Sequence, residues 1–160
     1  MTEHDVLSVE RVIAAPPERI FDLLADPDRH QEIDGSGTVR GTPGGSQRLA
    51  LGSKFGMSMH AGIGYSMEST VVEFEENRLI AWQPRPTVAP LRLLFGGRIW
   101  RYELTPRDGG THVRESWDIR KEVFPWSIRS LRNKTIESMT KTLDRIAAAV
   151  EGPVGGPVDK

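Results

Sequence analysis

The sequence predicts an α+β fold in which a curved antiparallel sheet of seven strands wraps around one long C-terminal helix. Between residues 36 and 119, turn residues separate short runs of β-forming residues, as is typical of an antiparallel meander. After residue 127, apolar residues recur every three or four positions, which indicates an amphipathic helix. One helix cannot fill the concave side of so wide a sheet, so we expect a cavity between the two.

The first strand is predicted over residues 6–14, which are rich in Val and Ile. Two short helices should follow before the second strand. Pro16-Pro17 opens the first, because proline is well tolerated in the first helical turn. This helix should end before Asp26-Pro27, since the residue before a proline avoids the helical conformation. The second helix is expected over residues 28–33.

The remaining strands are expected near residues 36–41, 53–61, 65–75, 78–83, 97–105 and 111–119. Asp108-Gly109 predicts a tight hairpin between the last two. The segment 84–97, "PRPTVAPLRLLFGG", has too many prolines to pair as a central strand.

We interpret segment 84–97 as a gate over the mouth of the cavity. Residues 88–95 carry three leucines and a phenylalanine that need apolar cover, and Gly96-Gly97 would act as a hinge. Two alternatives remain open. The segment would close one end of the sheet permanently as a short helix or turn, or it would touch a membrane, with Arg85, Arg92 and Arg98 on lipid phosphates.

The C-terminal helix is expected from about residue 127 to 151. A chain of 160 residues fits one domain, here residues 1–151. Residues 152–160, "GPVGGPVDK", are expected to form a disordered tail.

Composition argues against several classes of protein. The 21 Lys and Arg against 22 Asp and Glu leave a net charge of −1, which does not favour nucleic-acid binding. The absence of cysteine excludes disulfides and thiolate chemistry. The N-terminal residues lack an apolar signal core and no apolar run is long enough to cross a bilayer, so we expect a cytoplasmic protein without an integral membrane segment.

No metal or cofactor is expected. His4, His30, His60 and His112 do not have the spacing of zinc ligands. The acidic stretch 26–35, "DPDRHQEIDG", lacks the glycine and the terminal glutamate of a calcium loop. We interpret it as a solvated loop between two helices.

Five motifs and the long helix resemble the START-like, or SRPBCC, superfamily with the helix-grip fold, and most closely its polyketide cyclase/dehydrase-like branch. The motifs are "VERVIAAPPERIFDLLADPD", "GTVRG", "LGSKFGM", "TVVEFEENRLIAW" and "WRYELTPRDGGTHVRESWD". The resemblance covers about residues 6–150 and implies a ligand cavity between sheet and helix. It does not fix the activity, because the superfamily includes cyclases, lipid carriers, receptors and co-chaperones.

The stretch 51–70, "LGSKFGMSMHAGIGYSMEST", is unusually rich in Gly and Met for a strand pair. We expect Met57 and Met59, with the small residues beside them (Gly56, Ser58, Ala61 and Gly62), to line or border the cavity, because Met adapts to irregular apolar guests. Alternatively, the glycines form bulges and turns, and the methionines fill ordinary core gaps.

Glu115 is the leading catalytic candidate, with Tyr102 and His60 as possible partners. Period two places Glu115 on one face with Val113 and Trp117, and Tyr102 on one face with Trp100. If both faces point inward, burial among aromatics would raise the pKa of Glu115 and suit it to acid/base chemistry. Otherwise Glu115 pairs with a basic neighbour or faces solvent.

The remaining candidates would bind ligand without chemistry: Tyr65, Trp82, Trp100, Trp117 and Asn133. Arg129 and Arg132 are secondary candidates near the start of the long helix, where they are equally explained as surface residues.

We expect a domain that binds a small hydrophobic or lipid-like ligand, with no nucleic-acid partner. The alternative is a polyketide cyclase/dehydratase-type enzyme that uses acid/base chemistry in the same cavity. A third class is an interaction protein with an unused cavity, which a large exposed apolar patch would favour.

Overall fold

The computed structural model describes residues 5–36, 39–41, 47–60, 62, 64–88 and 96–151, with the backbone alone described at 39–41. The elements in chain order are β1 (Val6–Ile13), α1 (Pro17–Leu24), η2 (Pro27–Arg29), α2 (His30–Ile33), β2 (Val39–Gly41), β3 (Lys54–His60), β4 (Gly64–Glu75), β5 (Leu79–Pro86), β6 (Ile99–Arg107), β7 (Gly110–Asp118), η3 (Pro125–Ser127), η4 (Arg129–Leu131) and α4 (Arg132–Val150).

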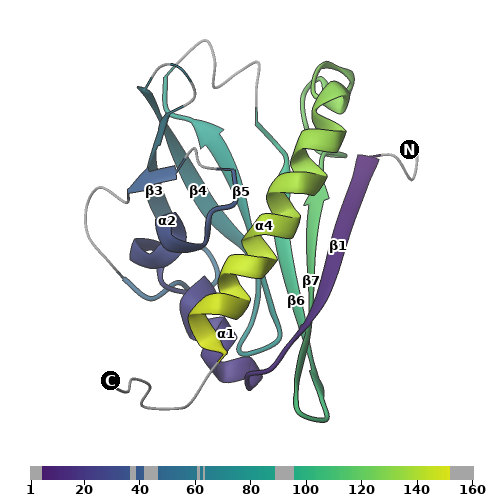
Figure 1. Ribbon diagram of the computed structural model, residues 1–160. Helices are drawn as coiled ribbons and strands as arrows, with labels where there is room; N and C mark the ends of the chain where they lie inside the picture. Colours follow the sequence, from purple (N-terminus) through teal and green to yellow (C-terminus); the bar gives the residue numbers. More distant parts are fainter. Residues whose placement is uncertain are drawn as a thin grey trace.

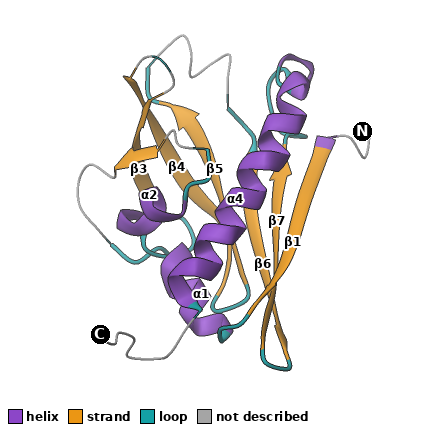
Figure 2. Cartoon of the chain, in the orientation of Figure 1, coloured by secondary structure: helices purple, strands orange, loops and turns teal. Residues whose placement is uncertain are grey.

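The strands form one antiparallel sheet in the order β1-β7-β6-β5-β4-β3-β2. Six of them have seven residues or more, whereas β2 has three and pairs with β3 through an irregular register. β1 pairs with β7, so the first and last strands of the chain are neighbours in the sheet. α4 crosses one face of the curved sheet diagonally, and α1 and α2 lie beside it (Figure 1). The predicted α+β architecture of antiparallel sheet and long C-terminal helix is therefore present (Figure 2).

Local sequence signals explain the first helices and the last hairpin. Pro17 starts α1, which ends at Leu24 before the Asp26-Pro27 pair. The second predicted helix is split, with a 3-10 turn at Pro27–Arg29 and one α-turn from His30. Asp108 and Gly109 join β6 to β7, whose ladder closes with Arg107 opposite Gly110.

The hydrophobic core is concentrated toward one end of α4. There its C-terminal half packs on α1 and the sheet through Leu143, Ile146 and Val150. A second cluster surrounds Trp117 and includes Ile128 and Met139.

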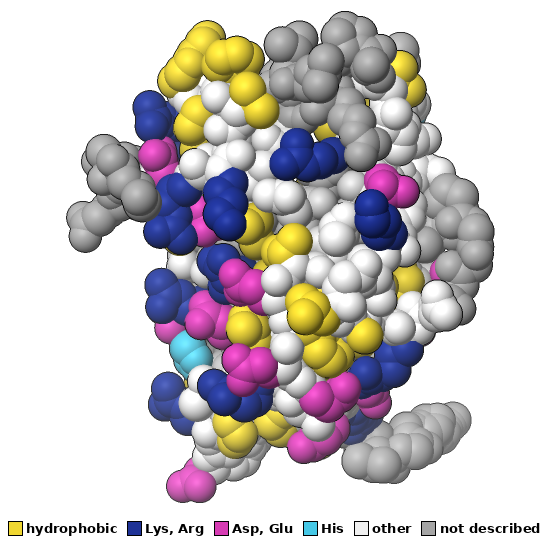
Figure 3. Space-filling view, turned by 180° about the vertical axis from the view of Figure 1, so that it is seen from behind, with side chains coloured by type: hydrophobic (Ala, Val, Ile, Leu, Met, Phe, Trp, Pro, Cys, Tyr) yellow, Lys and Arg dark blue, Asp and Glu magenta, His cyan; other side chains and the backbone are white. Residues whose placement is uncertain are grey.

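The long helix begins at Arg132, five residues later than expected. Residues 125–131 form two 3-10 turns instead, in which Ile128 N–H donates to the Pro125 carbonyl and Leu131 N–H to the Ile128 carbonyl. These tighter turns bring Ile128 into the cluster around Trp117. They also leave Val123, Phe124 and Trp126 exposed, and apolar side chains gather at this end of the molecule (Figure 3).

The first part of segment 84–97 does pair, although with one neighbouring strand and not as a central strand. β5 continues to Pro86, and Pro84 and Pro86 stand opposite Ser69 and Met67 of β4. β6 pairs only with residues 79–82 of β5, so beyond Trp82 the strand has a single neighbour and tolerates missing N–H donors. Residues 89–95 of the expected gate, and the expected tail 152–160, lie outside the described residues.

Within the described part of the chain, no helix has the length and apolar character needed to cross a membrane.

Candidate functional site

A cavity of about 360 Å³ lies between the sheet and the N-terminal half of α4. Its apolar wall comes mainly from β3 to β6 and consists of Ile33, Met57, Met59, Met67, Trp82, Pro84, Trp100, Leu131 and Met139. Its polar groups come from the α2 region, from β4, β6 and β7, and from α4. They are His30, Asp34, Ser36, Tyr65, Arg98, Tyr102, Glu115, Lys134, Thr135, Ser138 and Thr142.

α4 contributes one polar face to the cavity. Thr135, Ser138, Met139 and Thr142 follow one another at helical spacing and all reach the wall. The Thr142 hydroxyl donates to the Ser138 carbonyl over 3.0 Å and accepts from the Gly35 N–H over 2.9 Å. The helix therefore offers small and polar side chains where a larger apolar residue would fill the cavity.

Glu115 and Tyr102 form a hydrogen-bonded pair inside the cavity wall. They stand opposite each other on β7 and β6. Tyr102 Oη donates to Glu115 Oε2 over 2.9 Å, and the Glu115 residue is 2% exposed. Glu115 Oε1 is buried and has no hydrogen-bond partner among the described residues. One oxygen of this carboxyl group is thus held by the fold, and the other is left for a guest.

Burial raises the pKa of Glu115 to about 8; the Tyr102 hydrogen bond opposes this rise and the charge of Asp34 adds to it. Burial also raises the pKa of Tyr102 well above its usual value, and the neighbouring Glu115 adds to the effect. At neutral pH the pair is therefore uncharged, with a carboxylic acid and a phenol facing an apolar space.

His30 is a second buried polar group of the cavity. Its Nε2 lies 2.8 Å from the Leu24 carbonyl, which only accepts, so Nε2 carries the proton and Nδ1 keeps a lone pair. Nδ1 is buried without a partner in the described part of the chain. Burial lowers the pKa of His30, which keeps the ring neutral at pH 7. The imidazole therefore presents a hydrogen-bond acceptor.

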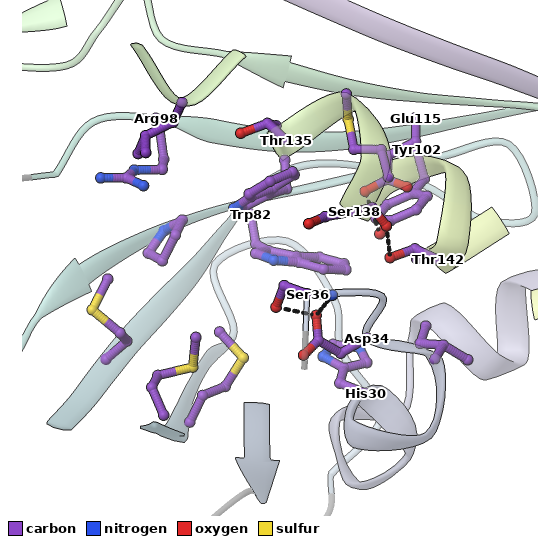
Figure 4. A pocket seen from close by; sticks show the side chains of 18 of the residues that line it. His30, Asp34, Ser36, Trp82, Arg98, Tyr102, Glu115, Thr135, Ser138 and Thr142 are labelled. Atoms are coloured by element: carbon purple, nitrogen blue, oxygen red, sulfur yellow. Dashed lines mark hydrogen bonds between the residues drawn. The ribbon is translucent and has the colours of Figure 1, made fainter. Parts of the chain in front are cut away.

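Trp82 lies between these two polar groups (Figure 4). Its ring stacks on His30 with centroids 4.9 Å apart, and lies 5.4 Å from the Tyr102 ring. A flat guest beside the Trp82 ring would have the carboxylic acid of Glu115 toward one side and the imidazole of His30 toward the other.

The short segment after α2 is clamped to α4. A Cβ on Gly35 would lie 2.2 Å from the Ser138 carbonyl oxygen, so only glycine permits this approach. The clamp holds Asp34 and Ser36 at the cavity, where Asp34 Oδ1 accepts from the Ser36 hydroxyl at 2.6 Å.

We define the open end of the cavity by two exposed residues in its lining. Tyr65 and Leu131 line it and are both exposed. Arg98 lies there too, and its backbone N–H and Nε both donate to the buried carboxylate of Glu122. A second depression shares Tyr65, Met67 and Arg98 with the cavity and continues it toward residues 86–88.

Most of the residues singled out in the sequence lie in the cavity wall: Met57, Met59, Tyr65, Trp82, Trp100, Tyr102 and Glu115. Three lie elsewhere. Trp117 shares the inward face with Glu115 but is 1% exposed behind Trp100, at a ring distance of 6.5 Å. His60 is exposed at the end of β3, and Asn133 is exposed on α4 one residue before Lys134, which does line the cavity.

The small residues of β3 have a different place from the one expected. Gly56 and Ser58 alternate with Met57 and Met59 and are absent from the cavity wall. Gly62 sits in the β3–β4 turn at φ 80°. Of the secondary candidates, Arg129 pairs with Asp5, with Nε 2.8 Å from Oδ1, and neither it nor Arg132 lines the cavity.

His30 and Asp34 were missed because they fall in the stretch 26–35, which was interpreted as a solvated loop, and Ser36, which follows that stretch, was also missed. His30 is instead 4% exposed, and α2 buries it beneath the cavity. One signal was available: "HQEI" places His30 and Ile33 on the same helical face, so an apolar neighbour marks the buried side. Thr135 and Thr142 in the apolar stripe of α4 were a second signal of a polar cavity face.

No group of three or more His, Cys, Asp or Glu side chains suited to a metal ion is found among the described residues.

Comparisons with known proteins place the chain in a family. A family model described as "Polyketide cyclase / dehydrase and lipid transport" matches residues 4–151. An uncharacterized protein of Mycobacterium tuberculosis is 39% identical over 110 residues, which is 66% of this chain and 44% of that protein. The chain thus spans less than half the length of this relative.

Several solved structures share the fold. A protein of Mycobacterium smegmatis superposes with a TM-score of 0.70 at 17% identity, covering 92% of this chain and 91% of that one. A protein of Chromobacterium violaceum gives 0.69 at 17% identity, covering 93% and 99%. The di-domain ARO/CYC StfQ from the steffimycin biosynthetic pathway gives 0.67 at 15% identity, covering 95% and 52%. Because the family model matches nearly the whole chain, the chain belongs to the polyketide cyclase/dehydrase and lipid transport family.

Proposed function

We propose that the protein binds a small, mostly apolar molecule that carries an uncharged oxygen group such as a carbonyl or hydroxyl. The observation that carries this proposal is a cavity of about 360 Å³ with Met and Trp walls and one buried, unpartnered carboxyl oxygen. This volume falls in the usual range for ligand sites, which combine apolar walls with a few directed polar groups.

The charge state of Glu115 narrows the ligand chemistry. Below pH 8 the carboxyl group is protonated, and because Oε2 accepts from Tyr102, Oε1 is free to offer the proton. A neutral acid donates to a carbonyl or hydroxyl oxygen, whereas the negative charge of Asp34 in the cavity wall would disfavour an anionic guest. We therefore expect neutral ligands to bind better than their carboxylate analogues.

The binding of the fluorescent apolar probe N-phenyl-1-naphthylamine tests this proposal. Ser138→Trp places an indole into the cavity from α4, and Thr140→Trp adds the same group on the exposed side of the helix. We expect the wild type and Thr140→Trp to bind the probe and Ser138→Trp to lose at least tenfold in affinity. Equal probe binding by all three folded proteins would contradict the proposal.

A second candidate function is proton transfer on a bound carbonyl compound. It is supported by two buried cavity groups whose pKa values move in opposite directions, upward for Glu115 and downward for His30. Glu115 would give its proton to the carbonyl oxygen, and His30 Nδ1, on the other side of Trp82, would take a proton from a carbon conjugated with that carbonyl farther along the guest. The carbon–hydrogen bond breaks, an oxygen–hydrogen bond forms, and the product is the enol.

This chemistry has its own readout. Exchange of the acidic protons of benzoylacetone in D₂O, followed by NMR, should be faster with the wild type than with buffer alone. Glu115→Gln and His30→Gln should each remove the acceleration while leaving probe binding within a few-fold of wild type. No acceleration by the wild type would leave the protein as a binder only.

A further inference from the structure

An exposed apolar cluster lies beside the open end of the cavity and takes no part in the site. Val123, Phe124 and Trp126 belong to the turn before α4, and Trp126 is 69% exposed. The rings of Phe124 and Trp126 lie 6.0 Å apart, so they form one contiguous surface. Leu131, which is also exposed, joins this cluster to the cavity wall.

Cationic residues precede and follow the cluster in the chain. Between residues 119 and 134 these are Arg120, Lys121, Arg129, Arg132 and Lys134, of which Arg120 pairs with Asp118 and Arg129 with Asp5. The single carboxylate in this stretch, Glu122, is buried and hydrogen-bonded to Gly96 and Arg98. In the space-filling view, hydrophobic side chains occupy this end of the molecule, with Lys and Arg side chains below them (Figure 3).

We infer that this surface, residues 121–131, docks on a membrane that contains anionic lipids. Aromatic side chains in a short turn suit the headgroup region, and the surrounding cations suit lipid phosphates. The same cations would repel those of a second copy of this chain. A protein partner usually needs about 20–30 residues a side, far more than this one turn offers.

Docking here would place the open end of the cavity at the bilayer. Leu131 and Arg98 line that end, and Glu122 ties Arg98 to the docking segment. An apolar ligand would then pass between lipid and cavity without crossing water. The inference on docking stands apart from the proposed binding, because vesicle binding and probe binding are measured separately.

Vesicle flotation at low salt tests the inference. We expect binding to vesicles of phosphatidylcholine with phosphatidylglycerol, at least tenfold weaker binding to phosphatidylcholine alone, and loss of binding as salt rises. The double variant Phe124→Ser/Trp126→Ser should bind these vesicles at least tenfold more weakly than the wild type. The control Leu51→Ser changes a residue that is 67% exposed elsewhere on the surface, and it should bind them as the wild type does. Lys121→Glu should weaken vesicle binding about fivefold or more, whereas Arg107→Glu on the distant β6–β7 hairpin should leave vesicle binding unchanged.

Three outcomes would overturn the inference. The first is equal binding to vesicles with and without the anionic lipid. The second is unchanged vesicle binding by a folded Phe124→Ser/Trp126→Ser protein. The third is a concentration-dependent dimer, seen by sedimentation velocity, that this double variant abolishes, which would make the surface an interface between copies.

Discussion

At pH 7 the Glu115 side chain is protonated inside the fold, because burial raises its pKa from 4.5 to about 8. In the unfolded chain the same group ionises near its ordinary value. The folded protein therefore holds one more proton than the unfolded protein between these two pH values. The free energy of unfolding must then fall as pH rises through that window, and level off above it.

Glu115→Gln is expected to remove this contribution. The amide is neutral at every pH and its oxygen still accepts from Tyr102. The stability of the variant relative to wild type should rise by about 1.4 kcal/mol per pH unit between roughly pH 5 and 8. Urea unfolding of both proteins at pH 5.5, 7 and 8.5 measures the difference, and parallel pH profiles would contradict the assignment.

The informative quantity is the difference in stability between the wild type and Glu115→Gln. His30 titrates in the same pH range, and its effect on the free energy of unfolding has the opposite sign to that of Glu115. Burial lowers its pKa, so its neutral ring stabilises the fold above its ordinary pKa of 6.5, and this stability is lost as pH falls. His30 is common to both proteins, so its effect cancels.

At the scale of elements, the end of segment 84–97 is anchored and does not act as a free hinge. The Gly96 N–H donates to Glu122 Oε1 over 2.7 Å, and Gly97 packs against the backbone of Lys121. Both glycines have positive φ, 126° and 113°, which proline cannot adopt. A proline at either position would break the fold locally.

Gly97→Ala should be strongly destabilising, by more than about 2 kcal/mol. A Cβ at this position would lie 1.9 Å from the Lys121 carbonyl oxygen. Gly109→Ala is the matched control, since Gly109 also has positive φ, 78°, but has open space around it. It should cost only about 1 kcal/mol. Thermal or urea unfolding of the two variants measures these losses of stability. Equal losses would mean that the backbone around Lys121 moves to accommodate the added Cβ at residue 97.

Periodicity and turn chemistry were enough to predict the order and type of the main elements, because each depends on neighbours in sequence, but they misplaced the start of α4 and the end of β5. Period two grouped Glu115 and Tyr102 with aromatic neighbours on their strand faces but left open whether these faces point inward, and the strand register brings the two residues together. Periodicity could not show how far α4 stands off the sheet, so Trp117 was predicted as a lining residue although Ile128 and Met139 cover it. The clamp of Gly35 on α4 joins residues more than 100 positions apart and has no local signal.

At the scale of the whole molecule, one helix serves two different environments. The C-terminal half of α4 packs into the closed core through Leu143, Ile146 and Val150. Its N-terminal half faces the cavity with Thr135, Ser138 and Thr142. Cavity-lining atoms lack packing partners on one side, so the two halves should differ in local stability.

Hydrogen exchange followed by mass spectrometry should resolve this difference. Backbone amides of residues 143–150 should exchange at least tenfold more slowly than those of residues 135–142, because opening the first group breaks the core and opening the second only widens the cavity. An apolar probe bound in the cavity should slow exchange in residues 135–142 and in β3, where Met57 and Met59 line the wall, and leave residues 143–150 unchanged. Ser138→Trp should reproduce the protection of residues 135–142 without any probe, since the indole supplies the missing contacts. Uniform exchange along α4, unaffected by probe or substitution, would mean that the helix packs equally tightly along its whole length and would contradict the prediction.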